Sequence, residues 1–235
     1  MVRGGGGGGG GGGGEVRSPA GLALIETMRA KEGRLPWLER HLARLRASCL
    51  ALGLAPPPAD LADVLRSIAG SGDRVVRLEL RDGRPEITTR DATAWQSPAI
   101  VVSDEVHRSY PNKTTLRDHF GRALASAKRI GADDALLFTA HGEIAEGTAW
   151  NLFWWEGETL CTPATDLGIL PGIARGRILE LIEVREVHAP ATALVGRSLF
   201  LANAVQGIMK IGTFERTHVP RHPRTAQLSA AFWPD

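Results

Sequence analysis

A strand followed by a tight turn, between residues 73 and 84, is the feature that most constrains the fold of this chain. Charged and apolar residues alternate from Asp73 to Leu80, which is the period of a strand with one buried face. The dipeptide Asp82-Gly83 then favours the turn of a β-hairpin, with the return strand at residues 86–89. The sequence therefore predicts an antiparallel pair of strands in the first half of the chain.

Two amphipathic helices are expected before this hairpin. After Pro36, apolar residues recur at helical spacing and stop at Gly53, a residue that commonly ends helices. A second apolar stripe follows the three prolines at 56–58. The members of the two stripes are Leu38, Leu42, Leu45, Cys49 and Leu52, and then Leu61, Val64, Leu65 and Ile68. Together with a strand at residues 22–29, these elements predict an α+β unit.

The rest of the chain is rich in strands, with fewer helices. A helix is expected from a cap at Thr115 to Gly131, and another at residues 170–183. Strands are expected at residues 98–102, 135–138, 143–146, 151–155, 159–162, 184–188, 198–202 and 207–211. The sequence therefore predicts a two-domain α/β (α+β) protein, with a small N-terminal domain at residues 18–105 and a larger C-terminal domain at residues 106–235.

Both ends of the chain are expected to be loose. Residues 4–14 are eleven consecutive glycines, which carry no apolar surface to bury and lose the most backbone entropy on ordering. Residues 1–17 are therefore expected to form a flexible tail. The segment from Arg216 onward is rich in Arg, Pro and Thr and is expected to be a second, weakly basic tail.

Composition excludes several classes of function. A formal charge of +2 is too small to favour nucleic acid or an anionic membrane as a partner, and no apolar run reaches the ~20 residues of a membrane span. Two distant cysteines are typical of a reduced, cytoplasmic protein. The seven histidines show no metal-ligand spacing, and the motifs Gly-x-Ser-x-Gly and Gly-x4-Gly-Lys-Ser/Thr are absent. The sequence thus indicates no metal site.

Lys113 is the first candidate for chemistry. It is one of four lysines in a chain with twenty-four arginines, and it lies between an extended segment and a predicted helix. A lysine can lose its proton and form an imine, whereas a guanidinium stays protonated. By itself the residue fits a solvated loop lysine equally well.

Three further candidates have equally ordinary alternatives. Arg44 borders the apolar stripe of the first helix, where it is either a surface arginine or a bidentate phosphate ligand. Glu146 lies in a short strand with alternating acids, one of which can simply face solvent. Residues 172–174 begin a helix and could offer free N–H groups to an anion. Leu-Pro-Gly is also common before helices that bind nothing.

The order of these segments along the chain carries more information than any one of them. From about residue 22 to residue 211, the chain resembles the fold-type IV (class IV aminotransferase-like) pyridoxal-phosphate enzymes. The resemblance rests on six segments, which are Ile25-Glu-Thr-Met-Arg29, Leu38-Glu-Arg-His-Leu-Ala-Arg-Leu45, Asn112-Lys-Thr-Thr115, Gly142–Phe153, Thr162-Pro163 with Gly168–Arg175, and Leu201–Ile208.

The resemblance implies a cofactor, pyridoxal 5'-phosphate, in a cleft between a small and a larger domain, and it implies a homodimer. Lys113 would bond covalently to the cofactor, and Arg44 would hold its phosphate together with the N–H groups of Ile173 and Ala174. Glu146 would bond the pyridine nitrogen and keep it protonated, so that the ring can accept electrons.

The resemblance is strongest to the aminodeoxychorismate lyases. It implies conversion of 4-amino-4-deoxychorismate to 4-aminobenzoate and pyruvate in folate synthesis. Asn203 and Ala204 are expected at the cofactor, although Ala174 and Ala204 lack hydroxyls that many members use on the phosphate. Arg77, Arg81 and Tyr110 are the candidates for substrate contact.

Two alternatives remain open at this point. One is a transaminase of the same fold acting on branched-chain amino acids, D-amino acids or amines, because both reactions begin with the same proton removal. The other is a binding module that keeps the fold without catalysis, which the missing hydroxyls and the unusual N-terminus would fit.

Overall fold

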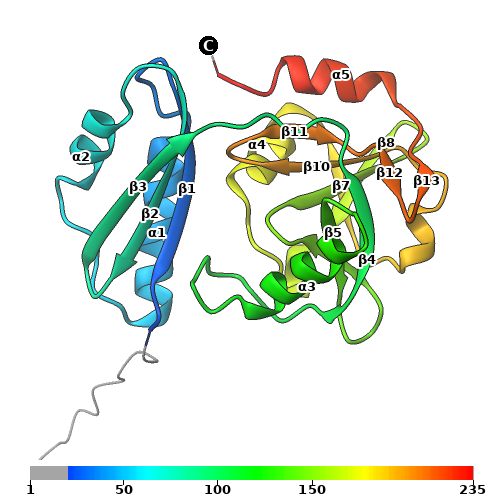
Figure 1. Ribbon diagram of the computed structural model, residues 1–235, viewed down its shortest axis with the longest axis horizontal. Helices are drawn as coiled ribbons and strands as arrows, with labels where there is room; N and C mark the ends of the chain where they lie inside the picture. The colour runs from blue at the N-terminus through cyan, green and yellow to red at the C-terminus, as the bar shows by residue number, and fades with distance from the viewer. Residues whose placement is uncertain (1–20, 235) are drawn as a thin grey trace, which may run out of the picture.

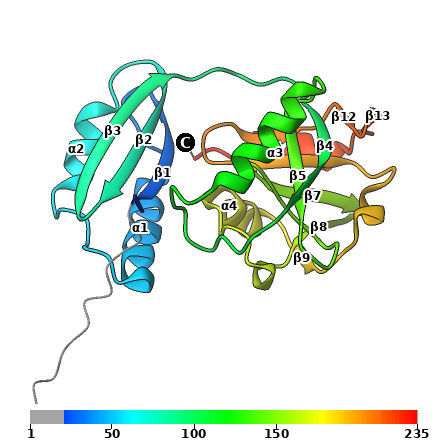
Figure 2. The ribbon, with the colours of Figure 1, turned by 60° about the horizontal axis from the view of Figure 1, so that its bottom comes forward.

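The chain forms two sheet-based parts that lie side by side (Figure 1). The computed structural model describes residues 21–234, so the glycine tract and the predicted N-terminal tail lie outside the described residues. A single extended crossing at residues 92–98 joins the two parts, as Figure 2 shows. None of the described helices is both long and apolar enough to cross a membrane.

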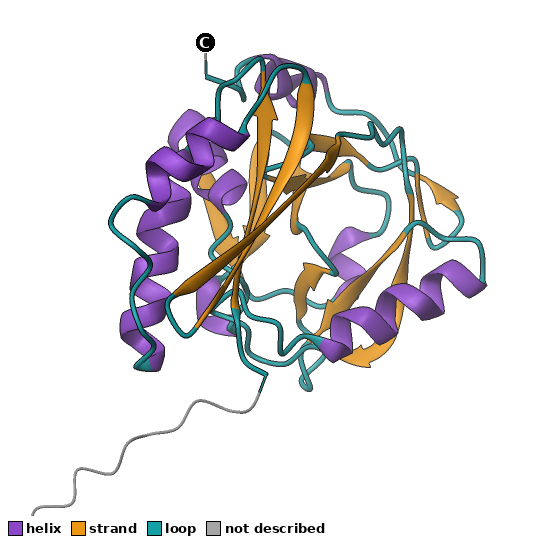
Figure 3. Cartoon of the chain, turned by 60° about the vertical axis from the view of Figure 1, so that its left-hand side comes forward, coloured by secondary structure: helices purple, strands orange, loops and turns teal. Residues whose placement is uncertain are grey.

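The small domain is a three-stranded antiparallel sheet with two helices on one face (Figure 3). Its strands are β1 (Leu24–Lys31), β2 (Asp73–Arg81) and β3 (Arg84–Asp91), in that order across the sheet. The helices α1 (Leu38–Leu52) and α2 (Leu61–Ile68) cover it. The predicted hairpin and both predicted helices are confirmed.

The two faces of β1 have different surroundings because successive side chains of a strand point in opposite directions. Leu24 and Met28 are buried in the core under α1. Glu26 lies between them on the same face and is bonded to α1 through His41. Thr27 points to the other face, which looks toward the large domain. One face of the strand therefore builds the core and the other lines a cavity.

The large domain contains two five-stranded sheets. The first has the order β13-β12-β4-β5-β6, with α3 (Asp118–Arg129) packed on β4 and β5. Its strands are β4 (Ala99–Val106), β5 (Asp134–Phe138), β6 (Ile144–Gly147), β12 (Thr213–Phe214) and β13 (Thr217–His218). Strand β4 runs parallel to both of its neighbours, β5 and β12.

The second sheet has the order β11-β10-β7-β8-β9, and α4 (Ile173–Leu181) packs on β10. Its strands are β7 (Asn151–Glu156), β8 (Thr159–Pro163), β9 (Val184–Val187), β10 (Leu199–Asn203) and β11 (Gly207–Lys210). Leu152 and Trp154 of β7 face the core between the sheets, whereas Phe153 and Trp155 face the helices. Both faces of β7 are buried, which explains its unbroken apolar run.

The expected domain boundary between residues 105 and 106 needs correction. Strand β4 pairs with β5, with Ile100 opposite Asp134, so residues 99–105 belong to the large domain. The boundary lies within the crossing at residues 92–98. The sequence shows an apolar strand at this place, but its pairing partner is more than thirty residues away and is not visible in local periodicity.

The expected loose tail after Arg216 is also wrong. This segment forms β13 and then α5 (Pro223–Ala230), and the side chain of Phe232, after the helix, is fully buried. Trp233 stacks on Trp37 of the small domain with ring centroids 4.9 Å apart, and Phe232 contacts the same ring edge-on at 5.1 Å. The C-terminal segment therefore packs against both domains.

Replacing Phe232 with alanine is expected to lower the free energy of unfolding by about 3–5 kcal/mol, because it removes a fully buried aromatic ring. Urea unfolding followed by tryptophan fluorescence measures this change. Val195, which is 73% exposed, provides the control, and Val195→Ala is expected to change the value by less than about 0.5 kcal/mol. Equal midpoints for Phe232→Ala and the wild type would show that the segment contributes no packing.

Candidate active site

Lys113 lies where a segment of the large domain joins the sheet of the small domain. The Lys113 carbonyl accepts a hydrogen bond from the Ile25 N–H at 2.7 Å, and Thr114 bridges to Leu24. The Thr115 N–H donates to the Ala23 carbonyl at 2.9 Å. These bonds place residues 113–115 alongside β1, at the edge of the small sheet. The backbone of Lys113 is therefore fixed at the seam between the domains.

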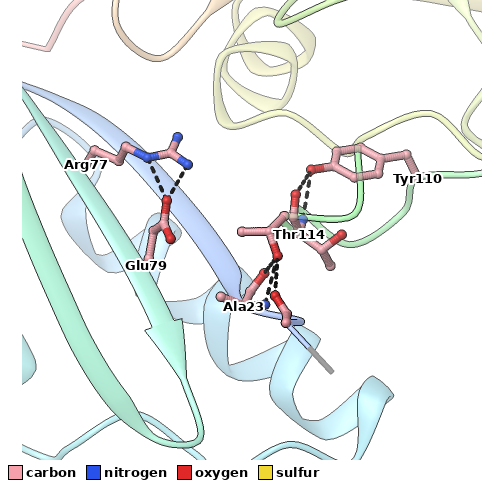
Figure 4. Close-up of polar contacts among 7 residues, drawn as sticks. Ala23, Arg77, Glu79, Tyr110 and Thr114 are labelled. Carbon is pink, nitrogen blue, oxygen red and sulfur yellow. Dashed lines mark hydrogen bonds and ion pairs between the residues drawn. The ribbon is translucent and has the colours of Figure 1, made fainter. Parts of the chain in front are cut away.

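Two hydroxyl groups hold this segment in place (Figure 4). The Tyr110 hydroxyl donates to the Thr114 carbonyl at 2.5 Å and accepts from the Thr114 N–H at 2.8 Å. The Thr115 hydroxyl accepts from the Ala23 N–H at 2.9 Å. Thr115 therefore does not cap α3 as predicted, because its side chain is bonded to the start of β1 instead.

The surroundings of Lys113 favour a neutral amine. Burial, together with the nearby charges of Arg44 and Arg117, lowers the pKa of Lys113 to about 7 against the opposing effect of Glu26 and Glu146. A desolvated lysine next to other cations is the arrangement that activates an amine as a nucleophile. Lys113 can thus act as a nucleophile or a base near neutral pH.

Arg44 connects the small domain to the start of α4. Helix α1 places its guanidinium so that Nη1 donates to the Pro171 carbonyl at 3.2 Å. Helix α4 begins after Gly172, a residue without a side chain that could cap the helix. The N–H groups of Ile173 and Ala174 lie in the first turn of α4, where N–H groups have no partner within the helix and can donate to an anion.

Gly172 is required by close packing. A Cβ atom at this position would lie 2.0 Å from Asn151 Oδ1. Asn151 Nδ2 in turn donates to the Leu170 carbonyl at 3.0 Å, which fixes the loop that precedes α4. The glycine of the predicted motif therefore allows the loop and β7 to approach each other.

Glu146 is a buried carboxylate on β6. Its Oε1 atom contacts His107 Nε2 at 3.0 Å and accepts from the Leu170 N–H at 3.1 Å. Both contacts use the same oxygen, and Oε2 makes no hydrogen bond within residues 21–234. One carboxylate oxygen is therefore anchored and the other is available to a ligand.

These residues surround one cavity of about 340 Å³ between the two domains. The structure brings nine predicted site residues to its wall, which are Arg44, Arg77, Tyr110, Lys113, Glu146, Ile173, Ala174, Asn203 and Ala204. Arg81 lies elsewhere, in a separate surface hollow with Asp82 and Glu86. Arg77 and Arg81 share a strand face, but four residues of strand separate them by about 13 Å.

Two more predicted side chains, like that of Tyr110, are occupied by contacts within the chain. Arg77 donates twice to Glu79 Oε1, at 3.0 and 2.6 Å (Figure 4). Asn203 Oδ1 accepts from the N–H groups of Val205 and Gln206 at 3.0 and 2.8 Å, which shapes the loop between β10 and β11. Asn203 therefore positions a loop of the cavity wall through its side chain.

Several residues of the site were missed in the sequence. Arg90, Trp95 and Lys128 line the cavity from β3, from the crossing between domains and from α3. Glu26 and His107 lie behind it and bond Arg44 and Glu146. Glu26 belongs to the segment Ile25-Glu-Thr-Met-Arg29. Its place between Leu24 and Met28, on the face of the strand that carries the core, is the sequence feature that could have indicated a role. Within residues 21–234, no group of three or more His, Cys, Asp or Glu side chains is arranged to hold a metal.

Comparison with known proteins identifies the family. The family model "Amino-transferase class IV" matches residues 23–214. The chain belongs to this family. It is 29% identical over 201 residues to a probable branched-chain-amino-acid aminotransferase of Rickettsia typhi, a match that covers 70% of this chain and 68% of that protein. The predicted family and enzyme class are confirmed.

Two solved structures of this class IV family show the same architecture. A putative 4-amino-4-deoxychorismate lyase aligns with a TM-score of 0.78 and 27% identity, over 92% of this chain and 91% of its own. A putative branched-chain amino acid aminotransferase from Thermotoga maritima aligns with a TM-score of 0.82 over 90% of this chain and 84% of its own. At 22% identity, the second likeness shows the fold alone. The predicted two-domain fold-type IV architecture is confirmed.

The cavity fits the cofactor of the family, pyridoxal 5'-phosphate. It offers a neutral amine at Lys113, free N–H donors beside a guanidinium at the start of α4, and a buried carboxylate with one available oxygen at Glu146. These groups match an aldehyde, a phosphate and a ring nitrogen. Ala174 and Ala204 line the cavity without hydroxyls, so the phosphate would depend more on Arg44 and on backbone donors.

The lowered pKa of Lys113 predicts reactivity at neutral pH. Since only the unprotonated amine attacks a carbonyl, reductive methylation of Lys113 by formaldehyde should rise with pH around a midpoint of about 7. An ordinary lysine has a midpoint near ~10.4. Peptide mass spectrometry on the cofactor-free protein measures the labelling, with the exposed Lys31 as an internal reference. A Lys113 profile that follows Lys31 would contradict the prediction.

Proposed function

We propose that this enzyme is a pyridoxal-phosphate-dependent lyase that converts 4-amino-4-deoxychorismate to 4-aminobenzoate and pyruvate. The observation that carries the proposal is the charge of the cavity wall. Six basic side chains line it, against two acids, Asp134 and Glu146. The basic residues are Arg44, Arg77, Arg90, Lys113, Arg117 and Lys128.

A dicarboxylate substrate matches this excess of positive charge. With Arg44 assigned to the phosphate and Lys113 to the chemistry, four cations remain for the substrate. A branched-chain amino acid has one carboxylate and an apolar side chain, so it would use fewer of these charges, two of which, on Arg77 and Lys128, also pair with Glu79 and Asp133. Aminodeoxychorismate has two carboxylates, and charge-assisted hydrogen bonds are the strong ones.

Each residue of the site has a task in this reaction. The cofactor, when bound, supplies an electron sink for the substrate carbon that bears the amine. Lys113 removes the proton from this carbon, the neighbouring C–O bond to the enolpyruvyl group breaks, and the ring becomes aromatic. The released enolpyruvate takes up a proton and becomes pyruvate. Arg44 and the start of α4 would hold the phosphate, and Glu146 would bond the ring nitrogen.

A transaminase acting on branched-chain amino acids is the second candidate. Its support is the similarity to the Rickettsia typhi aminotransferase, which extends over 70% of this chain. Both reactions begin with removal of the same proton by a lysine, so the residues described here serve either one.

The deciding experiment supplies purified protein and pyridoxal phosphate with aminodeoxychorismate, and measures pyruvate and 4-aminobenzoate in equal amounts. A parallel reaction measures amino transfer from leucine to 2-oxoglutarate. Release of both lyase products supports the proposal, and amino transfer without pyruvate supports the transaminase. A protein that stays colourless with added cofactor and turns over neither substrate would point to a binding module. The same preparations, run on a sizing column with light scattering, test the homodimer that the family resemblance implies.

A further inference from the structure

Glu26 is the centre of a buried ionic network behind the cavity. It is 1% exposed and lies on the face of β1 that is covered by α1. Its Oε2 contacts His41 Nδ1 at 2.6 Å and accepts from Arg44 Nη2 at 2.6 Å, while Oε1 accepts from Arg44 Nε at 2.9 Å. The carboxylate thus holds one edge of the Arg44 guanidinium in a bidentate pair.

A third N–H of this guanidinium contacts the other domain, and one N–H each of Nη1 and Nη2 remains for a ligand. Nη1 of Arg44 donates to the Pro171 carbonyl, one residue before the glycine that starts α4. A free arginine side chain samples many rotamers, so its position on the helix does not by itself fix the direction of the guanidinium. Glu26 does not line the cavity, whereas Arg44 does. The carboxylate therefore has no direct contact with a ligand in the cavity, and its contact with the phosphate site runs through the arginine.

His41 completes the network. Its Nδ1 atom faces Glu26, and its Nε2 atom is buried without a partner among the described residues. Burial lowers the pKa of His41, which keeps the ring neutral, so Nδ1–H donates to the carboxylate. Burial raises the pKa of Glu26, but the charge of Arg44 and the bond from His41 outweigh it and lower the value to about 2. Glu26 is therefore a carboxylate at any ordinary pH.

We propose that Glu26 is the positioning residue of the phosphate site, which fixes Arg44 in the orientation that binds phosphate and is itself held by His41. This inference rests on the proposed placement of the cofactor. A buried ion pair is weak evidence for a role in stability, because desolvation of the charges can cancel their attraction. Orientation of a ligand by a carboxylate behind it is a well-attested role, with effects of about 10–100-fold on affinity at metal sites.

The test compares two ligands that differ only in the phosphate. Dissociation constants of pyridoxal phosphate and of pyridoxal are measured by absorbance for the wild type and for Glu26→Gln. We expect Glu26→Gln to lower the preference for pyridoxal phosphate over pyridoxal by about 10–100-fold, since the charge that Glu26 exerts on Lys113 affects both ligands alike. A purely structural role would weaken both ligands alike, and that result would overturn the proposal.

Helix α1 offers a matched control. Arg40, one turn before Arg44, forms a bidentate pair with Glu180 at 2.7 and 2.9 Å, but this pair is at the surface. Glu180→Gln is expected to change neither dissociation constant. If Glu26→Gln does not fold by thermal melting, Glu26→Asp keeps the charge with a shorter reach and should lose part of the preference for the phosphate. An unchanged preference in a folded Glu26→Asp would also count against the proposal.

Arg44→Gln separates this inference from the proposed cofactor placement. If Arg44→Gln leaves the preference for pyridoxal phosphate over pyridoxal unchanged, the placement itself is wrong. If Arg44→Gln removes the preference and Glu26→Gln does not, only the positioning role fails. In the double variant Glu26→Gln/Arg44→Gln, we expect no loss beyond that of Arg44→Gln, since the carboxylate acts through the arginine.

Discussion

Replacing Lys113 with alanine is expected to lower turnover by about 10⁴-fold, the upper end of what a positioned proton-transfer group contributes. The side chain is half-buried at the seam between the domains, with a pKa lowered to about 7, so it is an amine at the cavity that can lose its proton near neutral pH. Steady-state rates of product release, measured at saturating cofactor, give the magnitude. Borohydride reduction should also fix the cofactor to a peptide that contains Lys113 in the wild type.

Two variants show that the amine itself is required. Lys113→Arg keeps the positive charge but cannot form an imine, so it should be as inactive as Lys113→Ala. Lys31→Ala, at an exposed position at the end of β1, should retain full activity. Turnover by Lys113→Arg within tenfold of the wild type would mean that Lys113 supplies charge alone.

Replacing Glu146 with glutamine is expected to lower turnover by about 10²–10³-fold, the range seen when one preorganised electrostatic group is removed from an active site. A neutral amide cannot hold a positive charge on the ring nitrogen, so the electron sink is weakened. The change is nearly isosteric, and the amide oxygen of glutamine can still accept from the Leu170 N–H. The ratio of kcat/KM between variant and wild type measures the effect.

Glu143 provides the matched control on the same hairpin. It is an acid three residues earlier, bonded to His188 at the surface, and Glu143→Gln should leave kcat/KM unchanged. Chemical unfolding of both variants separates catalytic loss from loss of the fold. If both glutamine variants lose activity equally, the effect arises from the hairpin and not from the carboxylate at the cavity.

Local patterns were sufficient for most of the secondary structure. The stripe from Leu38 to Leu52 and the stop at Gly53 are properties of one helix, whose C-cap residue has a φ of 63°. The alternation in β2 and the turn at Asp82-Gly83 are likewise decided by neighbours in sequence. Lys113, Arg44 and Glu146 were found because each lies in a short motif, and the order of the motifs is itself a sequence property.

Long-range contacts decided the remaining features. Thr115 carries the pattern of a helix cap, yet its hydroxyl is bonded to Ala23, ninety-two residues earlier in the chain. The end of the chain looks polar, but Phe232 and Trp233 insert next to Trp37. Arg77 and Arg81 are equivalent in the alternation of β2. The position of the large domain over the sheet decides that Arg77 lines the cavity and Arg81 does not.

The sequence by itself thus determined the family and most of the elements and supplied the candidate site residues, because these depend on side-chain periodicity and on short motifs. The tertiary structure alone decided how the side chains of the site are oriented. Glu26 reads as one of three charged residues in β1, and it becomes the partner of Arg44 only when α1 folds over β1. The physical reason is that a buried charge is tolerated only with a partner, and in this protein the partner comes from a different element.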